Sequence, residues 1–236
     1  MDERVVAVVP AGGRGARMGH EVPKQFLQLG DVPLLVHALR VLESSPIIHA
    51  IVMVVPENDV AYCRHKLVPQ FALSKIHHVV SGGASRQDSV WNGLQAVDAR
   101  AGIVVIHDAV RPFVTGTMVQ DVVDRARTHG AAVVAVPIRD TVKRVTRDGV
   151  IETTLDRQSL WVAQTPQAFK TGLLRDAHRL SRQRGVAATD DAFLVEQLGH
   201  EVSIVNGSAD NVKMTCPEDL VVGEAMLSAR LHGPSS

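Results

Sequence analysis

Residues 10–18 bring glycines and basic side chains together directly after an apolar run at residues 5–9 that is typical of a β-strand. Glycine tolerates positive φ, so such a loop can turn its backbone N–H groups toward a phosphate. Arg14 and Arg17 lie within the loop, and Lys24 follows it closely. Amide donors and cations at the end of a strand suit a nucleoside triphosphate. The alternative is a tight strand-to-helix connection whose arginines are solvated.

Two common phosphate-binding loops do not match this segment. The dinucleotide-binding fingerprint requires a third glycine where Met18 stands and a long helix directly after the turn, which Pro23 would break or kink. The P-loop ends in Gly-Lys-Ser/Thr, whereas here Lys24 follows Pro23. Taken by itself, the loop leaves both phosphate binding and a plain connection open.

Two further polar clusters follow predicted strands. Residues 81–83 (Ser-Gly-Gly) follow a strand at 77–80, with Arg86 and Ser89 close behind, and residues 107–112 follow the next predicted strand. Ligands of open parallel sheets bind beyond the carboxyl ends of the strands. We therefore expect the three clusters to form one shared site.

Asp108 is the carboxylate of this predicted site. At a strand end beside a triphosphate it would act best through a divalent cation such as Mg²⁺, which prefers oxygen ligands and phosphates. The alternative is a surface ion pair between Asp108 and Arg111. The neighbouring His107 is expected to pack at the strand end and not to act as a base.

Bulk composition restricts the class of protein. The chain has 236 residues, of which 45% are hydrophobic and 3% aromatic, so its core must consist of aliphatic side chains. Its 25 basic and 25 acidic residues cancel, which gives no reason to expect nucleic-acid or membrane binding. Cys63 and Cys216 are too far apart for a Cys-x-x-Cys pair, and no run approaches the ~20 apolar residues of a membrane span. We expect a cytoplasmic protein.

The elements that would position these clusters alternate between strands and helices. Strands are expected at residues 5–9, 50–55, 77–80, 103–106 and 131–136. Helices are expected at residues 34–42, from 56 onward, at 85–97 and at 117–129. Continuous apolar strands alternating with helices predict an α/β domain whose mainly parallel sheet is covered on both faces. We expect one domain over residues 1–236.

The pattern changes at about residues 138–158, which are charged. Residues 147–149 (Arg-Asp-Gly) are a hairpin signal between extended stretches at 141–146 and 150–155. Such a hairpin either folds onto its own domain or projects and packs on a second subunit. We favour projection, because an isolated hairpin needs another surface to bury its apolar side chains. These are Val142, Val145, Ile151 and Leu155.

The rest of the chain returns to helices and one strand. Helices are expected at residues 171–183, 190–198 and 217 to about 231, a strand at 201–205 and a short extended stretch at 211–215. Thr189, Asp190 and Asp191 are typical of a helix start, and a metal role for them is less favoured. Lys213 lies in the extended stretch, where a lysine by itself carries no functional signal.

Taken together, nine segments resemble one family over nearly the whole chain: residues 10–18, 23–25, 82–89, 107–112, 139–143, 156–157, 164–167, 189–190 and 210–215. In their order and spacing they are similar to the 2-C-methyl-D-erythritol 4-phosphate cytidylyltransferases of the non-mevalonate isoprenoid pathway. One departure is Gly12, where the family more often has a second alanine. The resemblance implies a Rossmann-like, GT-A-like nucleotidyltransferase domain with a protruding β-hairpin arm that forms a homodimer.

The resemblance also implies the reaction and its residues. CTP and methylerythritol phosphate would give the cytidylyl product and pyrophosphate, with Mg²⁺. Stabilisation at the α-phosphate would fall to Arg17 and Lys24, and placement of the substrate phosphate to Arg157 and Lys213. Nucleotide binding would fall to residues of two loops: Ala11, Gly12, Gly13, Gly15, Gly82, Arg86 and Ser89.

Substrate contacts, by the same resemblance, would come from Asp108, Arg111, Thr141 and Thr165. Asp108 would lie near the Mg²⁺ ion, in direct contact or through water. Thr141 and Arg157 belong to the arm, so they would act in the neighbouring subunit's site.

Such a reaction needs no general base, because a phosphate monoester is already largely dianionic at pH 7. Cations fixed in advance would let it approach the α-phosphate. Three other functions stay open at this point: a cytidylyltransferase for another polyol phosphate such as ribitol 5-phosphate, a non-catalytic subunit of the same fold, and a dinucleotide-dependent oxidoreductase. Met18 and Pro23 count against the last.

Overall fold

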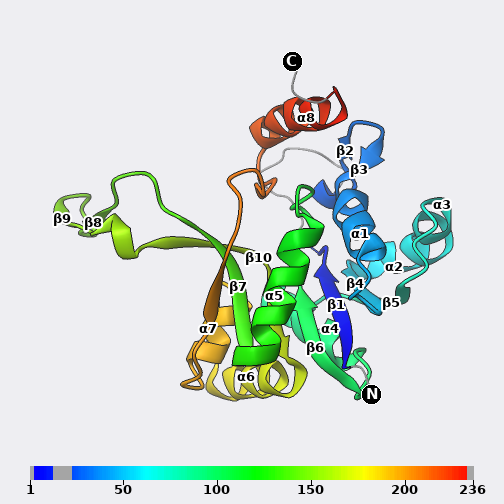
Figure 1. The fold of residues 1–236 in the computed structure, drawn as a ribbon, viewed down its shortest axis with the longest axis horizontal. Helices are drawn as coiled ribbons and strands as arrows, with labels where there is room; N and C mark the ends of the chain where they lie inside the picture. Colours follow the sequence, from blue (N-terminus) through cyan, green and yellow to red (C-terminus); the bar gives the residue numbers. More distant parts are fainter. Residues whose placement is uncertain (1–2, 13–22, 233–236) are drawn as a thin grey trace.

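A seven-stranded sheet forms the centre of the molecule (Figure 1) in a computed structural model that describes residues 3–12 and 23–232. The strands lie in the spatial order β11 (Ser203–Asn206), β7 (Ala131–Pro137), β10 (Trp161–Lys170), β6 (Ala101–Ile106), β1 (Arg4–Pro10), β4 (Ala50–Val55) and β5 (Ile76–Ser81). Within this sheet, β10 alone is antiparallel to its neighbours β6 and β7. The expected α/β class and mainly parallel sheet are confirmed.

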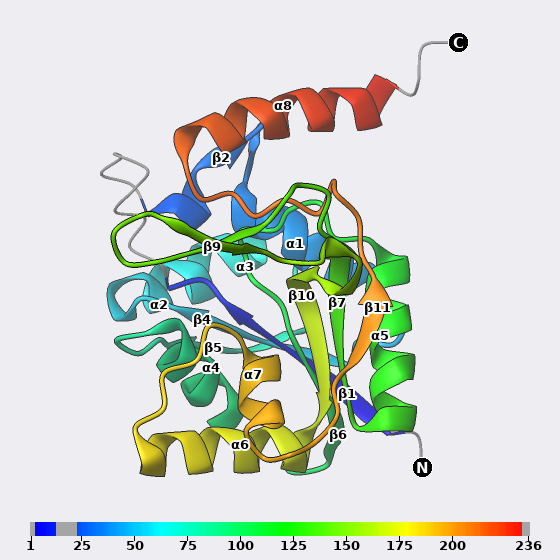
Figure 2. The ribbon, with the colours of Figure 1, turned by 90° about the vertical axis from the view of Figure 1, so that its left-hand side faces the viewer.

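Helices cover both faces of the sheet, as Figures 1 and 2 show. The alternation of side chains along β1 explains why: Val5, Ala7 and Val9 enter one hydrophobic cluster, whereas Val6 and Val8 enter the other. Because both faces are buried, the strand is apolar throughout. The first cluster packs against α1 (Leu34–Ser44) and α5 (Gly116–His129), and the second against α4 (Arg86–Gln95), α6 (Thr171–Arg184) and α7 (Asp191–Glu196).

Helix α5 illustrates how local sequence sets an element. Its N-cap Thr115 accepts a hydrogen bond from the Met118 backbone N–H, and it ends at Gly130 with φ +89°, a conformation that glycine adopts easily. Val119, Val122, Val123 and Ala126 are buried at helical spacing. The expected helix over 117–129 is confirmed within one residue.

A third apolar cluster closes the sheet at the carboxyl ends of its strands. Met214 and Phe113 are buried there beside the paired strands β2 (Gln28–Leu29) and β3 (Val32–Pro33). The last helix, α8 (Pro217–His232), packs on this cluster through Leu220, Met226 and Leu227. This cluster holds the 3-10 helix η1 (Lys24–Phe26) and the extended stretch with Lys213 near the sheet.

The helix expected from residue 56 is confirmed as a continuous helical stretch whose hydrogen-bond pattern changes along it: η2 (Glu57–Asp59, 3-10), α2 (Val60–Tyr62), η3 (Cys63–Leu67, π) and α3 (Val68–Gln70). The short strands β2 and β3 were not expected from the sequence. Strand β10 was not expected either. It bulges between Ala163 and Gln167, with a cis peptide bond at Thr165–Pro166. This bulge lies next to Asp108.

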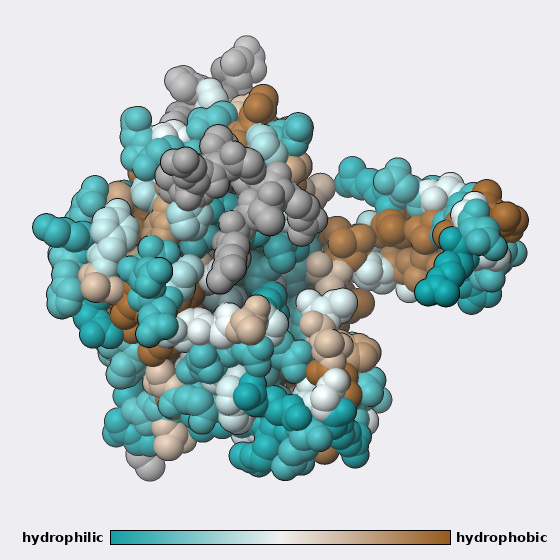
Figure 3. All heavy atoms as spheres, turned by 180° about the vertical axis from the view of Figure 1, so that it is seen from behind, coloured by the Kyte–Doolittle hydropathy of each residue, from teal (hydrophilic) through white to brown (hydrophobic). Residues whose placement is uncertain are grey.

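The hairpin over 138–158 projects from the body (Figure 1). It contains β8 (Lys143–Val145), β9 (Ile151–Thr154) and the 3-10 helix η4 (Arg157–Ser159), with the expected turn at Gly149, where φ is +81°. We call residues 138–158 the arm. Val145, Val150 and Ile151 are all more than half exposed, and Figure 3 shows hydrophobic residues on the arm's surface. The arm therefore projects with these three apolar side chains uncovered by its own domain, whereas Val142 and Leu155 are half-buried.

In the described part of the chain, no helix is long and apolar enough to cross a membrane. The cytoplasmic location stays a prediction.

Candidate active site

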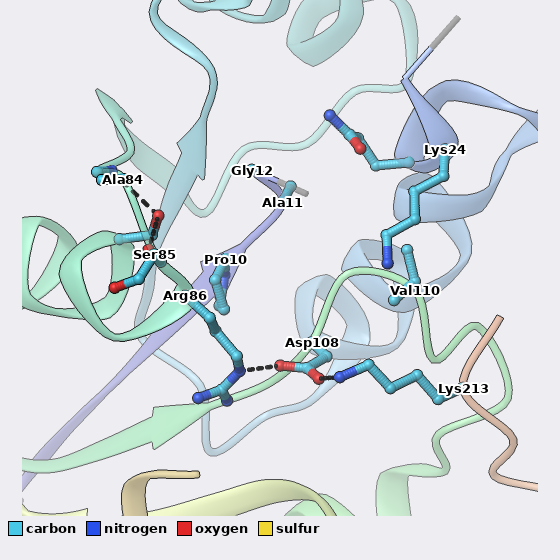
Figure 4. Close-up of a pocket in the computed structure, with 13 residues that line it drawn as sticks. Pro10, Ala11, Gly12, Lys24, Ala84, Ser85, Arg86, Asp108, Val110 and Lys213 are labelled. Carbon is cyan, nitrogen blue, oxygen red and sulfur yellow. Dashed lines mark hydrogen bonds and ion pairs between the residues drawn. The ribbon is translucent and has the colours of Figure 1, made fainter. Parts of the chain in front are cut away.

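Loops from several elements enclose a cavity of about 600 Å³ at the carboxyl ends of the parallel strands (Figure 4). Its wall contains Pro10, Ala11, Gly12, Lys24, Gln25, Gly83, Ala84, Ser85, Arg86, Ser89, Asp108, Val110 and Lys213. The described parts of the three clusters expected to share a site therefore meet, joined by two lysines from distant parts of the chain. Lys24 and Lys213 both point into this cavity, and Arg86 and Lys213 flank Asp108 (Figure 4).

The second glycine loop is fastened to the start of α4. Ser85 caps this helix by accepting a hydrogen bond from the Asp88 N–H, at 3.0 Å. The buried Ser89 hydroxyl accepts from the Gly83 N–H at 3.1 Å and donates to the Ser85 carbonyl at 2.9 Å. The α4 N-terminus thus faces the cavity, where its backbone dipole favours an anion.

Small residues are required where the two glycine loops approach each other. A Cβ on Gly82 would lie 2.9 Å from the Ser89 hydroxyl oxygen, so only glycine fits without a shift. A Cβ on Gly12 would lie 3.5 Å from the same atom, an ordinary contact. Position 12 therefore has room for a methyl group, whereas position 82 does not.

Asp108 is held between two cations. Arg86 Nε donates to Oδ1 at 2.8 Å and Lys213 Nζ donates to Oδ2 at 2.6 Å. Burial would raise the pKa of Asp108, but the positive charges of Arg86 and Lys213 outweigh it and hold the pKa well below its usual range. The alternative of an exposed pair with Arg111 is wrong, because Asp108 is 5% exposed and bonded elsewhere.

Arg86 has a second carboxylate partner behind the cavity wall. Its NH1 donates to Asp191 Oδ2 at 2.7 Å, and His178 Nε2 lies 2.9 Å from Asp191 Oδ1. Burial would lower the pKa of Arg86, but Asp191 and Asp108 together raise it above its ordinary value. Burial likewise opposes ionisation of Asp191, yet Arg86 and the bond to His178 keep its pKa lowered.

Thr165 and His107 hold the backbone of Asp108 through hydrogen bonds. The Thr165 hydroxyl accepts from the Asp108 N–H at 3.0 Å and pairs with His107 Nδ1 at 3.1 Å. His107 Nε2 lies 3.2 Å from the Arg111 carbonyl, so Nε2 carries the proton and Nδ1 accepts from Thr165. Burial lowers the pKa of His107 to about 4. His107 is therefore neutral at pH 7, and it packs as expected.

The stretch that carries Lys213 is anchored on both sides of that residue. The buried Asn211 donates from Nδ2 to the Thr165 carbonyl at 2.9 Å, and its own carbonyl accepts from Arg111 NH1 at 2.6 Å. The Met214 N–H donates to the Val110 carbonyl at 2.9 Å. The loop after β11 is thereby aligned with the loop after β6, which places Lys213 next to Asp108.

The predicted site residues fall into three groups. Those in or beside the cavity are Ala11, Gly12, Lys24, Gly82, Arg86, Ser89, Asp108, Arg111, Thr165 and Lys213. Gly13, Gly15 and Arg17 lie outside the described residues, as do Arg14 and Met18. Thr141 and Arg157 are exposed on the arm, where Arg157 NH1 donates to the Arg139 carbonyl at 2.8 Å, so this chain does not bring them to its own cavity.

Sequence reasoning assigned no role in the site to Gln25 or to Asp191. Gln25 lines the cavity with a fully buried side chain, and neither of its amide atoms has a hydrogen-bond partner among the described residues. Asp191 was interpreted as part of a helix start, with a metal role less favoured. Asp190 does cap α7 through the Phe193 N–H, whereas Asp191 turns inward to Arg86. Asp191 is the buried one of two successive acids and has no capping role, which could not be recognised from residue types.

Known proteins resemble this chain over nearly its full length. The curated 2-C-methyl-D-erythritol 4-phosphate cytidylyltransferase of Pelotomaculum thermopropionicum is 48% identical over 228 residues, which is 97% of this chain and 96% of the relative. That of Syntrophus aciditrophicus is 48% identical over 227 residues, covering 96% and 97%.

Solved structures agree with these sequence relatives. The 4-diphosphocytidyl-2C-methyl-D-erythritol synthase of Anaerococcus prevotii superposes with a TM-score of 0.86 at 27% identity, covering 96% of each chain. The Thermus thermophilus 2-C-methyl-D-erythritol 4-phosphate cytidylyltransferase gives a TM-score of 0.76 at 33% identity, covering 94% of this chain and 98% of the other. The model of one family, IspD, matches residues 5–229. With its sheet, its cavity and these relatives in agreement, the chain belongs to the 2-C-methyl-D-erythritol 4-phosphate cytidylyltransferase family.

Proposed function

We propose that this protein transfers a cytidylyl group from CTP to 2-C-methyl-D-erythritol 4-phosphate and releases pyrophosphate, a step in isoprenoid precursor synthesis. The observation that carries this proposal is the cavity itself. Lys24 and Lys213 line it together with the N-terminal end of α4, so fixed positive charge faces a space of about 600 Å³. Family membership then supplies the substrates.

The reaction proceeds by direct displacement. An oxygen of the substrate's phosphate dianion forms a bond to the α-phosphorus of CTP, while the bond from that phosphorus to the oxygen bridging to the β-phosphate breaks. Pyrophosphate leaves with the electron pair. The barrier is the meeting of two anions, so Lys24 stabilises the charge that builds on the α-phosphate, a role it would share with Arg17. Lys213 positions the incoming phosphate.

No described side chain has to remove a proton. His107 is buried, is bonded at both ring nitrogens and has its pKa lowered to about 4, so it stays neutral and supports the backbone of Asp108. This agrees with a nucleophile that enters the site already ionised.

A magnesium ion fits the residues at the cavity. Asp108 presents a carboxylate there, and among the described residues no three His, Cys, Asp or Glu side chains are grouped to hold a metal. Magnesium needs no such group, since it binds through one or two carboxylates together with substrate phosphates and water. When bound, it supplies positive charge that neutralises triphosphate oxygens. Asp108 would hold it, either directly or through water.

The arm completes the site in a homodimer. Thr141 and Arg157 lie on the projecting arm, away from the cavity of their own chain, while three of the arm's apolar side chains are uncovered. An arm that crosses to a second copy would bury these side chains and deliver Thr141 and Arg157 to the partner's cavity. Each cavity would then receive the substrate phosphate between Lys213 and an arginine of the other subunit.

Pyrophosphate release tests the function. The purified protein is incubated with CTP and Mg²⁺, together with either methylerythritol phosphate or ribitol 5-phosphate. Release with methylerythritol phosphate alone is expected, and equal release with ribitol 5-phosphate would reject the assigned substrate.

Lys24→Ala tests the catalytic role in the same assay. It should lower kcat by about 10²–10³-fold with the fold retained, because a fixed donor to the α-phosphate is lost. Lys66→Ala, which removes an exposed lysine of η3 outside the cavity wall, is the matched control and should keep wild-type turnover. A near-normal kcat for Lys24→Ala would remove Lys24 from the mechanism.

A further inference from the structure

A line of contacts between ionisable side chains runs from the interior to the cavity. It consists of His178 on α6, Asp191 on α7, Arg86 on α4, Asp108 after β6 and Lys213 after β11. Successive members are 2.9, 2.7, 2.8 and 2.6 Å apart. Figure 4 shows the cavity end of this line, where Arg86 and Lys213 meet Asp108.

Asp191 and His178, at the inner end of the line, do not form the cavity wall. Burying their polar groups costs free energy. The side chains of Asp191 and His178 are 1% and 0% exposed, and neither lines the cavity. Removing a carboxylate from water costs several kcal/mol, and hydrophobic replacements of buried ion pairs are often as stable or more so. Stability alone therefore gives little reason for a charge at Asp191.

Asp191 limits where the Arg86 guanidinium can point. Arg86 uses Nε for Asp108 Oδ1 and NH1 for Asp191 Oδ2, so its planar group is fixed at two positions. With Oδ1 occupied, the carboxylate of Asp108 directs Oδ2 at Lys213. The Arg86 side chain is 27% exposed and lines the cavity, so without its inner anchor it could turn toward a bound triphosphate.

We propose that Asp191 is a positioning residue for cytidylyl transfer: it holds Arg86 on Asp108 and away from the triphosphate, and so orients Asp108 and Lys213. The inference rests on the proposed function. A guanidinium released onto the triphosphate would bind CTP in the ground state without serving the transition state, which leaves affinity intact and slows turnover. Loss of Asp191 therefore separates CTP affinity from turnover.

Asp191→Asn tests this with little change in volume. The expected result is a kcat lower by about 10- to 100-fold, because small misplacements of reacting groups are that costly. The Kd for CTP, measured by calorimetry without the second substrate, should be equal to or tighter than that of the wild type. A purely structural role for Asp191 would weaken CTP binding along with turnover.

Two control variants separate positioning from packing. Asp190→Asn makes the same substitution one residue earlier, at a carboxylate that caps α7 and pairs with Gln167 but does not touch Arg86. His178→Gln disturbs the other side of Asp191 and keeps a donor of similar reach. Neither residue contacts Arg86, so both variants should keep kcat within about threefold of wild type. Thermal unfolding of all variants reports their stability.

The outcomes are distinct. A wild-type kcat in Asp191→Asn, a weakened CTP affinity, or an equal kcat loss in Asp190→Asn would each overturn the positioning role. If Asp191→Asn does not fold, Arg86→Lys tests the contact from the other side, because one ammonium cannot bridge both carboxylates as the fork does. Full kcat in that variant also overturns the inference. A wild-type protein that releases no pyrophosphate would instead contradict the proposed function.

Discussion

Asp108 and His107 are adjacent residues, but their surroundings make one of them charged and the other neutral. Asp108 ionises because Arg86 and Lys213 contact it, whereas burial keeps His107 neutral. Pairs of titratable groups with divergent environments usually divide acid and base roles between them. Here the neutral imidazole has no access to the cavity, so the pair places one fixed negative charge among cations. The chemistry of this site is electrostatic.

The lowered pKa of His107 makes stability depend on pH. Between pH 4 and the ordinary 6.5, the unfolded chain binds a proton at this residue that the folded chain does not. The contribution of His107 to the free energy of unfolding is therefore fully present above about pH 6.5, and it is lost as the pH falls toward about 4. We expect the free energy of unfolding to drop by about 2 kcal/mol between pH 7 and pH 5 on account of His107.

Urea unfolding at the two pH values measures this drop, and His107→Gln is the control. The variant lacks the titrating ring, so its decrease between pH 7 and pH 5 should be smaller by that amount. An equal decrease in both proteins would assign the pH dependence to other groups.

Some residues of the site could be assigned from the sequence, and others could not. Asp108 follows a buried strand, and that position was enough to predict a carboxylate in the site. The partners of Arg86 were not predictable, because Asp191 lies 105 residues away and its environment depends on how α7 packs. Lys213 was placed through the family resemblance, since nothing in its own segment distinguishes it from a surface lysine.

At the level of elements, four of the predicted strands share one property: β1, β4, β6 and β7 are apolar because both of their faces are buried. Strand β10 breaks this pattern. Its sequence contains Gln164, Thr165, Pro166 and Gln167 at buried positions, and proline argues against a central strand. The bulge between Ala163 and Gln167 takes Pro166 out of the ladder, and the polar side chains are satisfied by Asn211, Asp190 and the backbone of Asp108. Such tertiary compensation has no local signal.

Helix α4 packs on the sheet through Gly93, and Gly93→Ala should be destabilising. An added Cβ would lie 2.5 Å from Val8 Cγ1 and 2.8 Å from Val54 Cγ2. The better helix propensity of alanine would stabilise the helix by about 1 kcal/mol at most, whereas overpacking destabilises by about 1–3 kcal/mol. Overpacking would also push α4, with Arg86, away from β1 and β4. We expect a lower unfolding free energy together with reduced turnover.

The matched control for this helix is Gly172→Ala in α6, where an added Cβ meets nothing within 4 Å. There the propensity gain is unopposed, so chemical denaturation should show equal or slightly higher stability, by up to about 1 kcal/mol. If Gly93→Ala were as stable as Gly172→Ala, the close packing of α4 on the sheet would not be a constraint.

At the level of the whole molecule, the proposed homodimer would divide the site between two chains. Lys24 and Lys213 belong to one cavity, while Arg157 lies on the projecting hairpin. The sequence predicted the projection, because a charged hairpin with a few apolar side chains cannot be stable alone. What it packs against is not encoded locally, and the homodimer stays a prediction.

Mixing inactive variants tests the shared site. Arg157→Ala and Lys24→Ala should each be nearly inactive. After subunit exchange of an equal mixture, about a quarter of the sites should be intact, because half of the dimers are mixed and one of their two sites carries both wild-type residues. Pyrophosphate release should recover accordingly.

Lys24→Ala mixed with Lys213→Ala is the control, since both lysines line the same cavity of one chain and every mixed site still lacks one of them. Recovery in this control, or its absence in the first mixture after verified exchange, would contradict a site shared through the arm.

Strand β10 has a consequence for how the chain can change in evolution. Its first residues lead out of the arm, and its bulge supports Asp108, so a single backbone serves both regions. A deletion of one residue between Leu160 and Gln164 would turn the alternation of side chains to the opposite face of the sheet. Insertions are tolerable at the tip near Gly149, which has open space around it. The hairpin can therefore change length at its tip. A change in length at its base would instead shift the register of β10, the strand that supports Asp108.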